Sequence, residues 1–341
     1  AEDRETFLQL VETADGLIEN LRAGVLDRLG VGWDVCHARN PRLVYACIRG
    51  FGDPRNAPSP YAEWPAYDLI AQAMGGVVAS TGEDTEHVMK VGPPIGDTVP
   101  GLMTALGLLA ALHRARDTGE GQFLDVAMVD AMMSISSESL TSWSYTGRPQ
   151  RPSGNTVDGL TPFDIYATAD GHCAIAAPTP PQWAKLCDII GRPDLITDER
   201  TAHIRQRLKH RQVVDDAVGG WARARTNAEV IAALGDAVPV GPVYAPKDWV
   251  GDPHVAAREM LVAVEHPHHR PTVQVNCPIR FTETPAGVYK RAGLLDEATG
   301  RWGYGIFALI NAAVFLYGIG TFIGFRNAWN DILASKLLKL R

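Results

Sequence analysis

An aspartate at the junction of a predicted strand and a predicted helix is the first candidate for chemistry in this chain. Asp130 follows the β-forming run 123–128 and opens a run of helical character over 131–134. Free N–H groups and the dipole at the start of a helix stabilise a carboxylate, so an aspartate at this corner can be a helix N-cap or an ionised nucleophile. The local pattern leaves both interpretations open, and the cap is the commoner role.

The elements that must position Asp130 alternate between helix and strand. Helices are predicted over 5–15, 25–29, 67–73 and from Asp97 to Arg116, and strands at 17–18, 43–48 and 123–128. This alternation predicts βαβ units with a parallel sheet, and hence an α/β, Rossmann-like large domain. The helix that ends at Arg116 is apolar on nearly every face, so we expect it to be buried between layers.

A second domain is predicted after Gly147, where proline and glycine become frequent and indicate a linker. Beyond the linker the pattern predicts a hairpin (163–168 with 173–177), helices over 182–190, 208–224 and 227–234, and strands at 240–244 and 260–266. This is typical of a smaller α+β unit. We therefore expect a large domain over 1–147, a small domain over 148–275 and a return segment over 276–300.

Composition narrows the class of protein. The 341 residues suffice for about two domains, and 46% hydrophobic residues allow a full core. A net charge of -7 without a long basic run argues against nucleic acid as a partner. Five cysteines, odd in number and without a CxxC spacing, indicate a reducing compartment, so a cytoplasmic location is expected.

The C-terminal stretch 303–325 contains no charged residue and is long enough to span a bilayer. Trp302 and Tyr304 stand at its near end, where interface residues are common. We expect an apolar C-terminal helix that acts as a transmembrane anchor. A buried core helix, or unrelated sequence joined to an enzyme, are the alternative interpretations.

Other chemistries have little support. The run from His266 to His269 lacks a cysteine or carboxylate cluster at ligand spacing, so no metal site is expected. Ser134, Ser136 and Ser137 lack a G-x-S-x-G corner, which argues against a serine hydrolase. No G-x-G-x-x-G follows a strand, so the Rossmann-like sheet is not interpreted as an NAD site.

Several motifs, in order along the chain, carry a resemblance to a known family. They are Glu-Asn-Leu-Arg-Ala-Gly at 19–24, Asn-Pro-Arg-Leu-Val-Tyr at 40–45, Tyr-Asp-Leu-Ile-Ala-Gln-Ala-Met-Gly-Gly at 67–76, the stretch 119–133, Ala-Asp-Gly at 169–171, Val-Gly-Pro-Val at 240–243 and Asp-Pro-His at 252–254. With these motifs the chain resembles the class III CoA-transferases, a group that includes formyl-CoA transferase, carnitine CoA-transferase and α-methylacyl-CoA racemase. Several motifs at compatible spacing are far more specific than any one of them.

The resemblance implies that Asp130 is the nucleophile. In this family the matching carboxylate attacks the thioester carbonyl of an acyl-CoA, which gives a mixed anhydride and free CoA thiolate, and a carboxylic acid then exchanges through the same kind of intermediate. The implied substrates are coenzyme A, as a co-substrate, and a small carboxylic acid, with no metal. The resemblance also implies a homodimer, because the two chains of family members interlock.

The CoA side of the resemblance rests on Asn20, Leu21 and Arg28. These match positions that line the CoA groove in the family, and Arg28 is the one able to contact a phosphate. The alternative for Arg28 is a salt bridge with Asp27 or Glu19. Leu21 stands where the family often has phenylalanine.

Tyr67 and Asp68 separate two activities within the family. Family racemases carry a histidine at the Tyr67 position, because inversion of an α-carbon needs a second acid/base group. Tyr67 followed by Asp68 resembles the transferases, in which the tyrosine hydroxyl lies near the acyl group. The alternative is that Tyr67 is an aromatic residue at the edge of the core.

Two departures from the family pattern keep further interpretations open. The family's first strand, helix and following strand would lie before Ala1, and the closing motif expected after 286–288 is replaced by 291–341. We therefore expect a CoA-transferase with an N-terminally truncated large domain. A racemase-like isomerase, and an inactive fragment tethered to a membrane for binding, are the alternatives.

Overall fold

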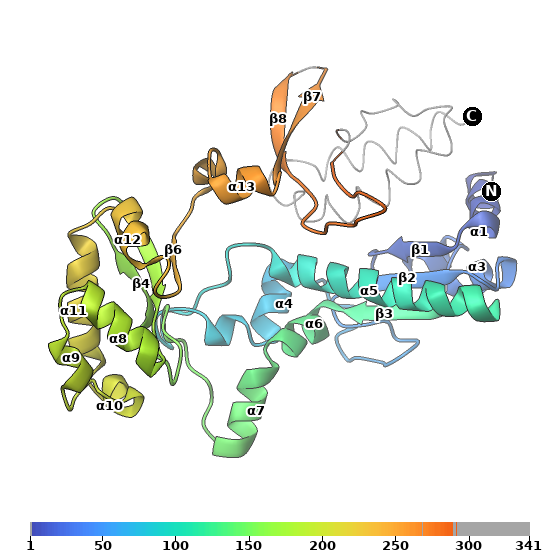
Figure 1. The fold of residues 1–341 in the computed structure, drawn as a ribbon. Coiled ribbons are helices and arrows are strands. Elements are labelled where there is room, and N and C mark those ends of the chain that lie inside the picture. Colours follow the sequence, from blue (N-terminus) through green and yellow to red (C-terminus); the bar gives the residue numbers. More distant parts are fainter. Residues whose placement is uncertain (1, 268, 289–290, 292–341) are drawn as a thin grey trace. The chain divides into compact units, whose positions relative to one another are not determined.

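The computed structural model describes residues 2–267, 269–288 and 291. These residues form two compact units, the first ending at Pro152 and the second beginning at Ser153 (Figure 1). The division falls in the proline- and glycine-rich stretch that follows Gly147. The predicted apolar helix at 303–325 and most of the return segment beyond 288 lie outside the described residues.

The first unit contains a parallel three-stranded sheet, so the α/β prediction is confirmed. Its strands are β1 (Gly16–Glu19), β2 (Val44–Arg49) and β3 (Phe123–Ala127), in the order β1-β2-β3. Both pairs run parallel, with Ile18 opposite Ala46 and Ala46 opposite Leu124. All three strands therefore end at the same edge of the sheet, the edge where open α/β sheets bind ligands.

Helices cover both faces of this sheet. The helices of this unit are α1 (Glu2–Thr13), α2 (Val25–Arg28), α3 (Trp33–Arg39), α4 (Asp68–Met74), α5 (Ile95–Thr118), α6 (Met128–Ile135) and α7 (Ser137–Thr146), with a 3-10 turn, η1 (Val78–Ser80). Among them, α1 and α3 pack on one face of the sheet and α5 on the other. Tyr45 and Cys47 of β2 pack in one cluster with Leu8 of α1 and Cys36 of α3. Val44, on the opposite face, packs with Ala111 and Ala115 of α5. Helix α5 runs along this side of the sheet (Figure 1). Because successive side chains of a strand point to opposite faces of the sheet, β2 contributes to a separate hydrophobic cluster on each face.

The prediction that the long apolar helix is buried between layers is wrong for the described chain. Helix α5 packs on the sheet through Ala111 and Ala115, but Leu102, Leu106 and Leu109 are 71%, 72% and 66% exposed. Among the described helices, α5 is the one whose length and apolar composition would suffice to cross a membrane. Its small buried residues and large exposed leucines leave one apolar face without a partner within the described part of the chain.

The second unit is a small α+β fold built on an antiparallel sheet, as predicted. Strands β4 (Phe163–Ala167), β5 (His172–Ala176) and β6 (Val240–Pro242) are ordered β4-β5-β6. Its helices are α8 (Pro180–Ile189), α9 (Asp194–Thr197), α10 (Ile204–Lys209), α11 (Arg211–Arg223) and α12 (Asn227–Leu234). Trp183, Leu186, Val214 and Val218 lie in its core, each at most 2% exposed.

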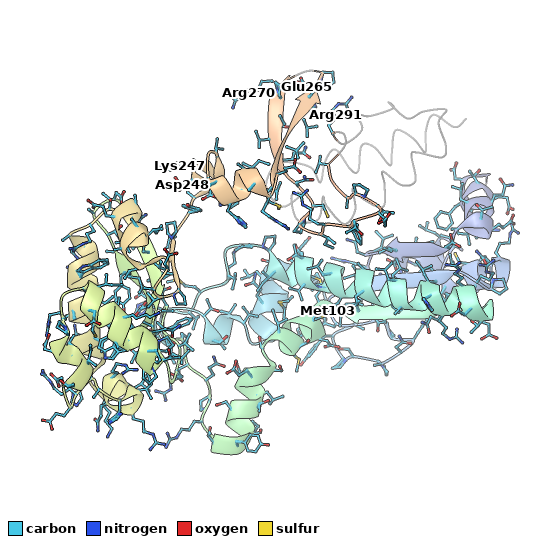
Figure 2. The ribbon with its side chains drawn as sticks, viewed as in Figure 1. Met103, Lys247, Asp248, Glu265, Arg270 and Arg291 are labelled. Carbon is cyan, nitrogen blue, oxygen red and sulfur yellow. The ribbon has the colours of Figure 1, made fainter. Side chains whose placement is uncertain are left out.

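The rest of the second unit is an extension. It comprises the 3-10 turn η2 (Pro246–Trp249), α13 (Pro253–Ala257) and an antiparallel hairpin of β7 (Leu261–His266) and β8 (His269–Val275). Glu265 and Arg270 extend from the two strands of this hairpin (Figure 2). Strand β8 was not predicted from the sequence.

Candidate active site at the carboxyl edge of the parallel sheet

Asp130 lies in the first turn of α6, immediately after β3. The helix begins earlier than the sequence suggested, because its N-cap is Ala127 and Asp130 is its third residue. The interpretation of Asp130 as a plain N-cap is therefore wrong. The side chain is exposed, and no hydrogen bond or ion pair within the described residues engages its carboxylate. An uncommitted carboxylate next to the N–H groups of a helix start is available to a ligand.

The start of α6 is held in place by its neighbours. The Val129 N–H donates to the Gly50 carbonyl at the end of β2, at 3.2 Å. A Cβ at Gly75, which ends α4, would lie 2.1 Å from the Cβ of Met132, so only glycine allows α4 to approach α6 this closely. Met132 is fully buried in this contact. The helix that carries Asp130 is therefore fixed against both the sheet and α4.

The predicted CoA-binding residues follow β1 at the same edge. Asn20 and Leu21 are exposed and come directly after the strand, and Arg28 ends the single turn α2. Since β2 lies between β1 and β3, this segment and the start of α6 stand about two strand spacings, roughly 10 Å, apart along the edge. One extended ligand that runs along the carboxyl edge can reach both.

The salt-bridge alternative for Arg28 is wrong. Glu19 pairs with Arg49, at 2.5 Å between Oε1 and Nη2, and Asp27 pairs with Arg55. Within the described residues Arg28 itself forms no ion pair or hydrogen bond, and its Nη1 lies near Gly24 at the start of the turn. An exposed guanidinium without a carboxylate partner remains free to bind a phosphate.

Tyr67 and Asp68 start α4, and the structure gives them different surroundings. Tyr67 is the N-cap residue and is 54% exposed, so its ring does not lie in the core. Asp68 instead connects α4 to the start of α5. Its Oδ1 accepts from the Gly96 N–H and from Nε2 of Gln72, each at 2.8 Å. Asp68 thus acts as a tertiary cap that satisfies the second amide of α5, and the predicted catalytic role for it remains a prediction.

This tertiary cap supports the start of α5 at Ile95, two residues before the predicted start at Asp97. A helix start needs acceptors for its first N–H groups, and Asp68 supplies one from outside the helix. Asp97, in the same first turn, has a buried Oδ1 without a hydrogen-bond partner among the described residues. Burial, together with the charge of Asp68, raises the pKa of Asp97 to about 7.

A buried ion pair at this edge was missed by the sequence analysis. Glu19 and Arg49 end β1 and β2 and are 9% and 7% exposed. Arg49 donates to both carboxylate oxygens of Glu19, at 2.5 and 2.8 Å, and to the Leu21 carbonyl. Glu19 Oε2 also accepts from the Leu21 N–H at 2.7 Å. The available signal was that two adjacent parallel strands end in opposite charges.

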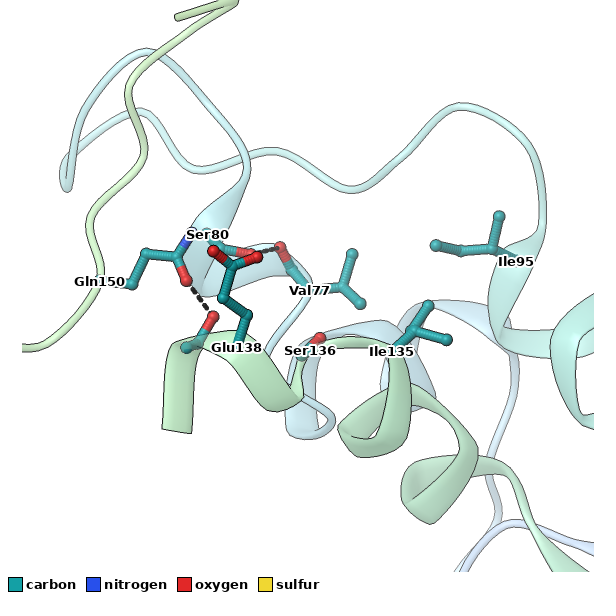
Figure 3. A pocket seen from close by; sticks show the side chains of 8 residues that line it. Val77, Ser80, Ile95, Ile135, Ser136, Glu138 and Gln150 are labelled. Atoms are coloured by element: carbon teal, nitrogen blue, oxygen red, sulfur yellow. Dashed lines mark hydrogen bonds between the residues drawn. The ribbon is translucent and has the colours of Figure 1, made fainter. Parts of the chain in front are cut away.

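A hollow of about 210 Å³ opens where α6 meets α7 (Figure 3). It is lined by Val77, Ser80, Ile95, Ile135, Ser136, Glu138, Ser139 and Gln150. Two of its three serine hydroxyls are already engaged, since Ser80 donates to the Val77 carbonyl at 3.0 Å and Ser139 donates to Gln150. The lining includes none of the residues at the carboxyl edge, so this hollow is not the candidate site.

Comparison with known proteins gives a consistent result. CoA-transferase family III matches residues 1–299 of the chain. The chain is 39% identical over 297 residues to a succinyl-CoA:mesaconate CoA-transferase of Haloarcula hispanica, covering 87% of this chain and 74% of that protein. It is 32% identical over 282 residues to a succinyl-CoA–D-citramalate CoA-transferase of Chloroflexus aurantiacus, covering 82% of this chain and 69% of that protein.

A solved structure shares the fold. A CaiB/BaiF family protein from Brucella suis superposes with a TM-score of 0.78 at 29% sequence identity, covering 89% of this chain and 79% of that one. Residues 1–299 thus match one family by sequence, and most of the chain matches a solved relative in three dimensions.

Proposed function

The chain belongs to CoA-transferase family III, and we propose that it transfers coenzyme A from an acyl-CoA to a carboxylic acid through a mixed anhydride at Asp130. The observation that carries this proposal is the exposed carboxylate of Asp130 in the first turn of α6, which has no partner among the residues that the structure describes. It stands at the carboxyl edge of a parallel sheet, the edge at which α/β folds bind ligands. Membership of the family supports CoA transfer in general, and this carboxylate supplies a nucleophile for it.

The proposed chemistry needs a carboxylate and no external acid or base. An oxygen of Asp130 attacks the thioester carbonyl, the C–S bond breaks, and CoA leaves as a thiolate, which gives a mixed anhydride. The thiolate then attacks the aspartyl carbonyl, releases the donor acid as a carboxylate, and leaves CoA on Asp130 as a thioester. The acceptor carboxylate repeats these steps in reverse. The N–H groups at the start of α6 would stabilise the oxyanions.

The rest of the proposed site divides between two loops. Asn20, Leu21 and Arg28 would hold CoA, with the unpaired guanidinium of Arg28 on a phosphate. Tyr67, exposed at the start of α4, would face the acyl group. Asp68 stands beside it, and its hydrogen bonds to Gly96 of α5 and to Gln72 of α4 support a role in holding Tyr67 rather than contact with the substrate.

The relatives suggest which substrates to test first. Both CoA-transferases described above have succinyl-CoA in their names, with mesaconate or D-citramalate as the second substrate. We therefore propose succinyl-CoA as the donor and a short dicarboxylic acid as the acceptor. The family resemblance also implies a homodimer. The assay should therefore use the purified chain at a concentration that allows it to dimerise.

The test makes the same substitution, aspartate to asparagine, at the proposed nucleophile and at a control position. Asp130→Asn should lower kcat by roughly 10³-fold or more, because a neutral amide cannot form the anhydride. Asp117→Asn, which changes an exposed aspartate paired with His113 near the end of α5, should keep wild-type rates. Formation of the new acyl-CoA is followed by chromatography. Exchange of the α-proton in deuterated water without transfer of CoA would instead support the racemase-like alternative.

A further inference from the structure

The turn α2, which carries Arg28, has one hydrophobic contact with the core, because the partly buried Leu26 packs against the cluster that contains Cys36 and Tyr45. Helix α2 is a single turn of four residues, and none of them is buried. So short a helix is not stable by itself in water, because one turn does not offset the cost of nucleation. Its orientation must therefore be set by contacts with other segments.

One side-chain contact reaches α2 from the loop that follows β2. Asp27, the residue before Arg28, forms an ion pair with Nη2 of Arg55. Gly32 makes room for this contact, since a Cβ there would lie 2.0 Å from Oδ1 of Asp27. The guanidinium of Arg55 also lies 5.5 Å from the centre of the Phe123 ring, at the start of β3. Arg55 thus bridges α2 and the sheet.

Arg55 is itself held by the buried charges of the carboxyl edge. Its N–H donates to Oδ1 of Asp53 at 3.0 Å, and its Nη1 lies 3.4 Å from the same oxygen. Asp53 is 2% exposed, its N–H donates to both oxygens of Asp125 on β3 at 2.9 Å, and its Oδ2 lies 3.4 Å from Arg49. The loop after β2 is therefore attached to the sheet by several polar contacts, and Arg55 links it to α2.

We propose that Arg55 is a positioning residue, which through Asp27 fixes α2 so that Arg28 points at a phosphate of CoA. This inference rests on the proposed function, because it assigns to Arg55 the orientation of a CoA-binding residue. Arg55 touches neither substrate nor Asp130 in this role. It acts on the affinity for CoA and leaves the chemical step unchanged.

Steady-state kinetics of the purified chain test the proposal. Arg55→Met should raise KM for succinyl-CoA about tenfold and leave kcat within about twofold, because an exposed ion pair adds little stability but sets the geometry of a charge-assisted contact. Arg55→Lys, which keeps a charge toward Asp27, should recover most of the loss. Arg39→Met is the matched control: Arg39 joins α3 to Glu5 and Glu12 on α1, and its loss should change neither constant.

A second variant covers the case in which Arg55→Met fails to fold, since it also leaves the buried Asp53 with one partner fewer. Asp27→Asn removes the charge on α2 and keeps Arg55 next to Asp53. It should raise KM for succinyl-CoA to a similar extent. The proposal is overturned if Asp27→Asn, or a folded Arg55→Met, has the same KM as Arg39→Met.

A measurement without substrate separates this proposal from the proposed function. Amide hydrogen exchange in the free protein should be faster over residues 20–28 in Arg55→Met and Asp27→Asn than in the wild type and in Arg39→Met. If the wild type transfers no CoA but this difference is found, the proposed function fails and the positioning contact stands. If exchange over 20–28 is the same in all variants, the positioning contact fails whatever the activity.

Discussion

At the scale of single residues, the candidate site depends on which charges are paired and which are free. Most charged groups at the carboxyl edge neutralise one another, as Glu19 and Arg49 do. Asp130 and Arg28 are exceptions within the described chain, one negative and one positive, and Arg22 in the loop after β1 is another. A free carboxylate and a free guanidinium match the two ends of a CoA thioester, the reacting carbonyl and the phosphates.

Replacement of Arg28 should weaken CoA binding without affecting the chemical step. Arg28→Met removes a charge-assisted contact of about 1.5–3 kcal/mol, so KM for the acyl-CoA should rise by roughly ten- to a hundredfold with a nearly constant kcat. Arg116→Met alters an exposed arginine near the end of α5, close to the opposite edge of the sheet, and serves as the control. Steady-state kinetics measure KM for both variants. Equal KM values would contradict a role for Arg28 in CoA binding.

The second unit contains a buried arginine whose role is structural. Arg207 is 0% exposed and donates to the carbonyls of Thr161, Pro178 and Thr201, at 3.2, 2.8 and 2.9 Å. Arg207→Met would leave these buried acceptors without donors, at about 1–3 kcal/mol for each one that water does not reach. We expect the free energy of unfolding in urea to fall by about 3 kcal/mol or more. A loss below about 1 kcal/mol would show that the carbonyls find other donors.

At the scale of secondary structure, the contacts between α4, α5 and α6 determine how the site is built. Gly75 lets α4 touch α6, and Asp68 caps α5 from the side. The hydrophobic contacts among these helices centre on Ala71, Met128 and Met132. Changes in this junction should therefore alter the stability of the unit and the position of Asp130 together.

The buried carboxyl of Asp97 makes this junction sensitive to pH. Its pKa is raised from 3.8 to about 7, so the folded state retains a proton that the unfolded chain releases between about pH 4 and 7. Folding stability contributed by this group is therefore present below pH 4 and declines as the pH rises through 7. Asp97→Asn, which stays neutral, should be more stable than the wild type at pH 8, and the advantage should shrink toward pH 5.

Urea unfolding at pH 5 and pH 8 measures this difference. Asp117→Asn, at an exposed position on the same helix, should give the same small change at both pH values. If Asp97→Asn destabilises the protein equally at pH 5 and pH 8, the carboxyl of Asp97 is ionised in the folded state at both.

The sequence pattern was sufficient to predict the elements that bury a periodic apolar face. The hairpin of β4 and β5 and the helix Asn227–Leu234 follow their patterns closely. Helix α7 was missed because none of its residues is buried, so it leaves no apolar period to detect. The start of α5 was misplaced because its cap, Asp68, comes from another element. The charged network was missed because Arg49 and Glu19 lie on different strands and meet only after these strands pair.

At the scale of the whole molecule, the described chain has two units, each with its own core. Apolar side chains are exposed on the first unit. Leu102, Leu106 and Leu109 form a stripe on α5, and Trp143 and Tyr145 on α7 are 53% and 87% exposed. Contiguous exposed apolar patches are characteristic of protein–protein contacts. The predicted cytoplasmic location and the predicted anchor at 303–325 remain proposals, and carbonate extraction of membranes tests the anchor.

The exposed apolar faces favour the homodimer that the family resemblance implies. Light scattering coupled to size-exclusion chromatography should give twice the mass of one chain. Leu106→Glu, in the middle of the α5 stripe, should shift the protein toward the monomer, because a charge buried at an interface without a partner costs several kcal/mol. Asp117→Glu, which lies outside the stripe, should leave the mass unchanged. A monomer for the wild type would contradict the proposed assembly.

Chemical trapping at Asp130 tests the central claim most directly. The purified chain is incubated with succinyl-CoA and hydroxylamine, digested, and analysed by mass spectrometry. An acylated aspartate reacts with hydroxylamine to a hydroxamate, so we expect this modification at Asp130, dependent on the acyl-CoA and absent from Asp130→Ala. Transfer of CoA that proceeds normally in Asp130→Ala, or a hydroxamate at a different carboxylate, would contradict the account.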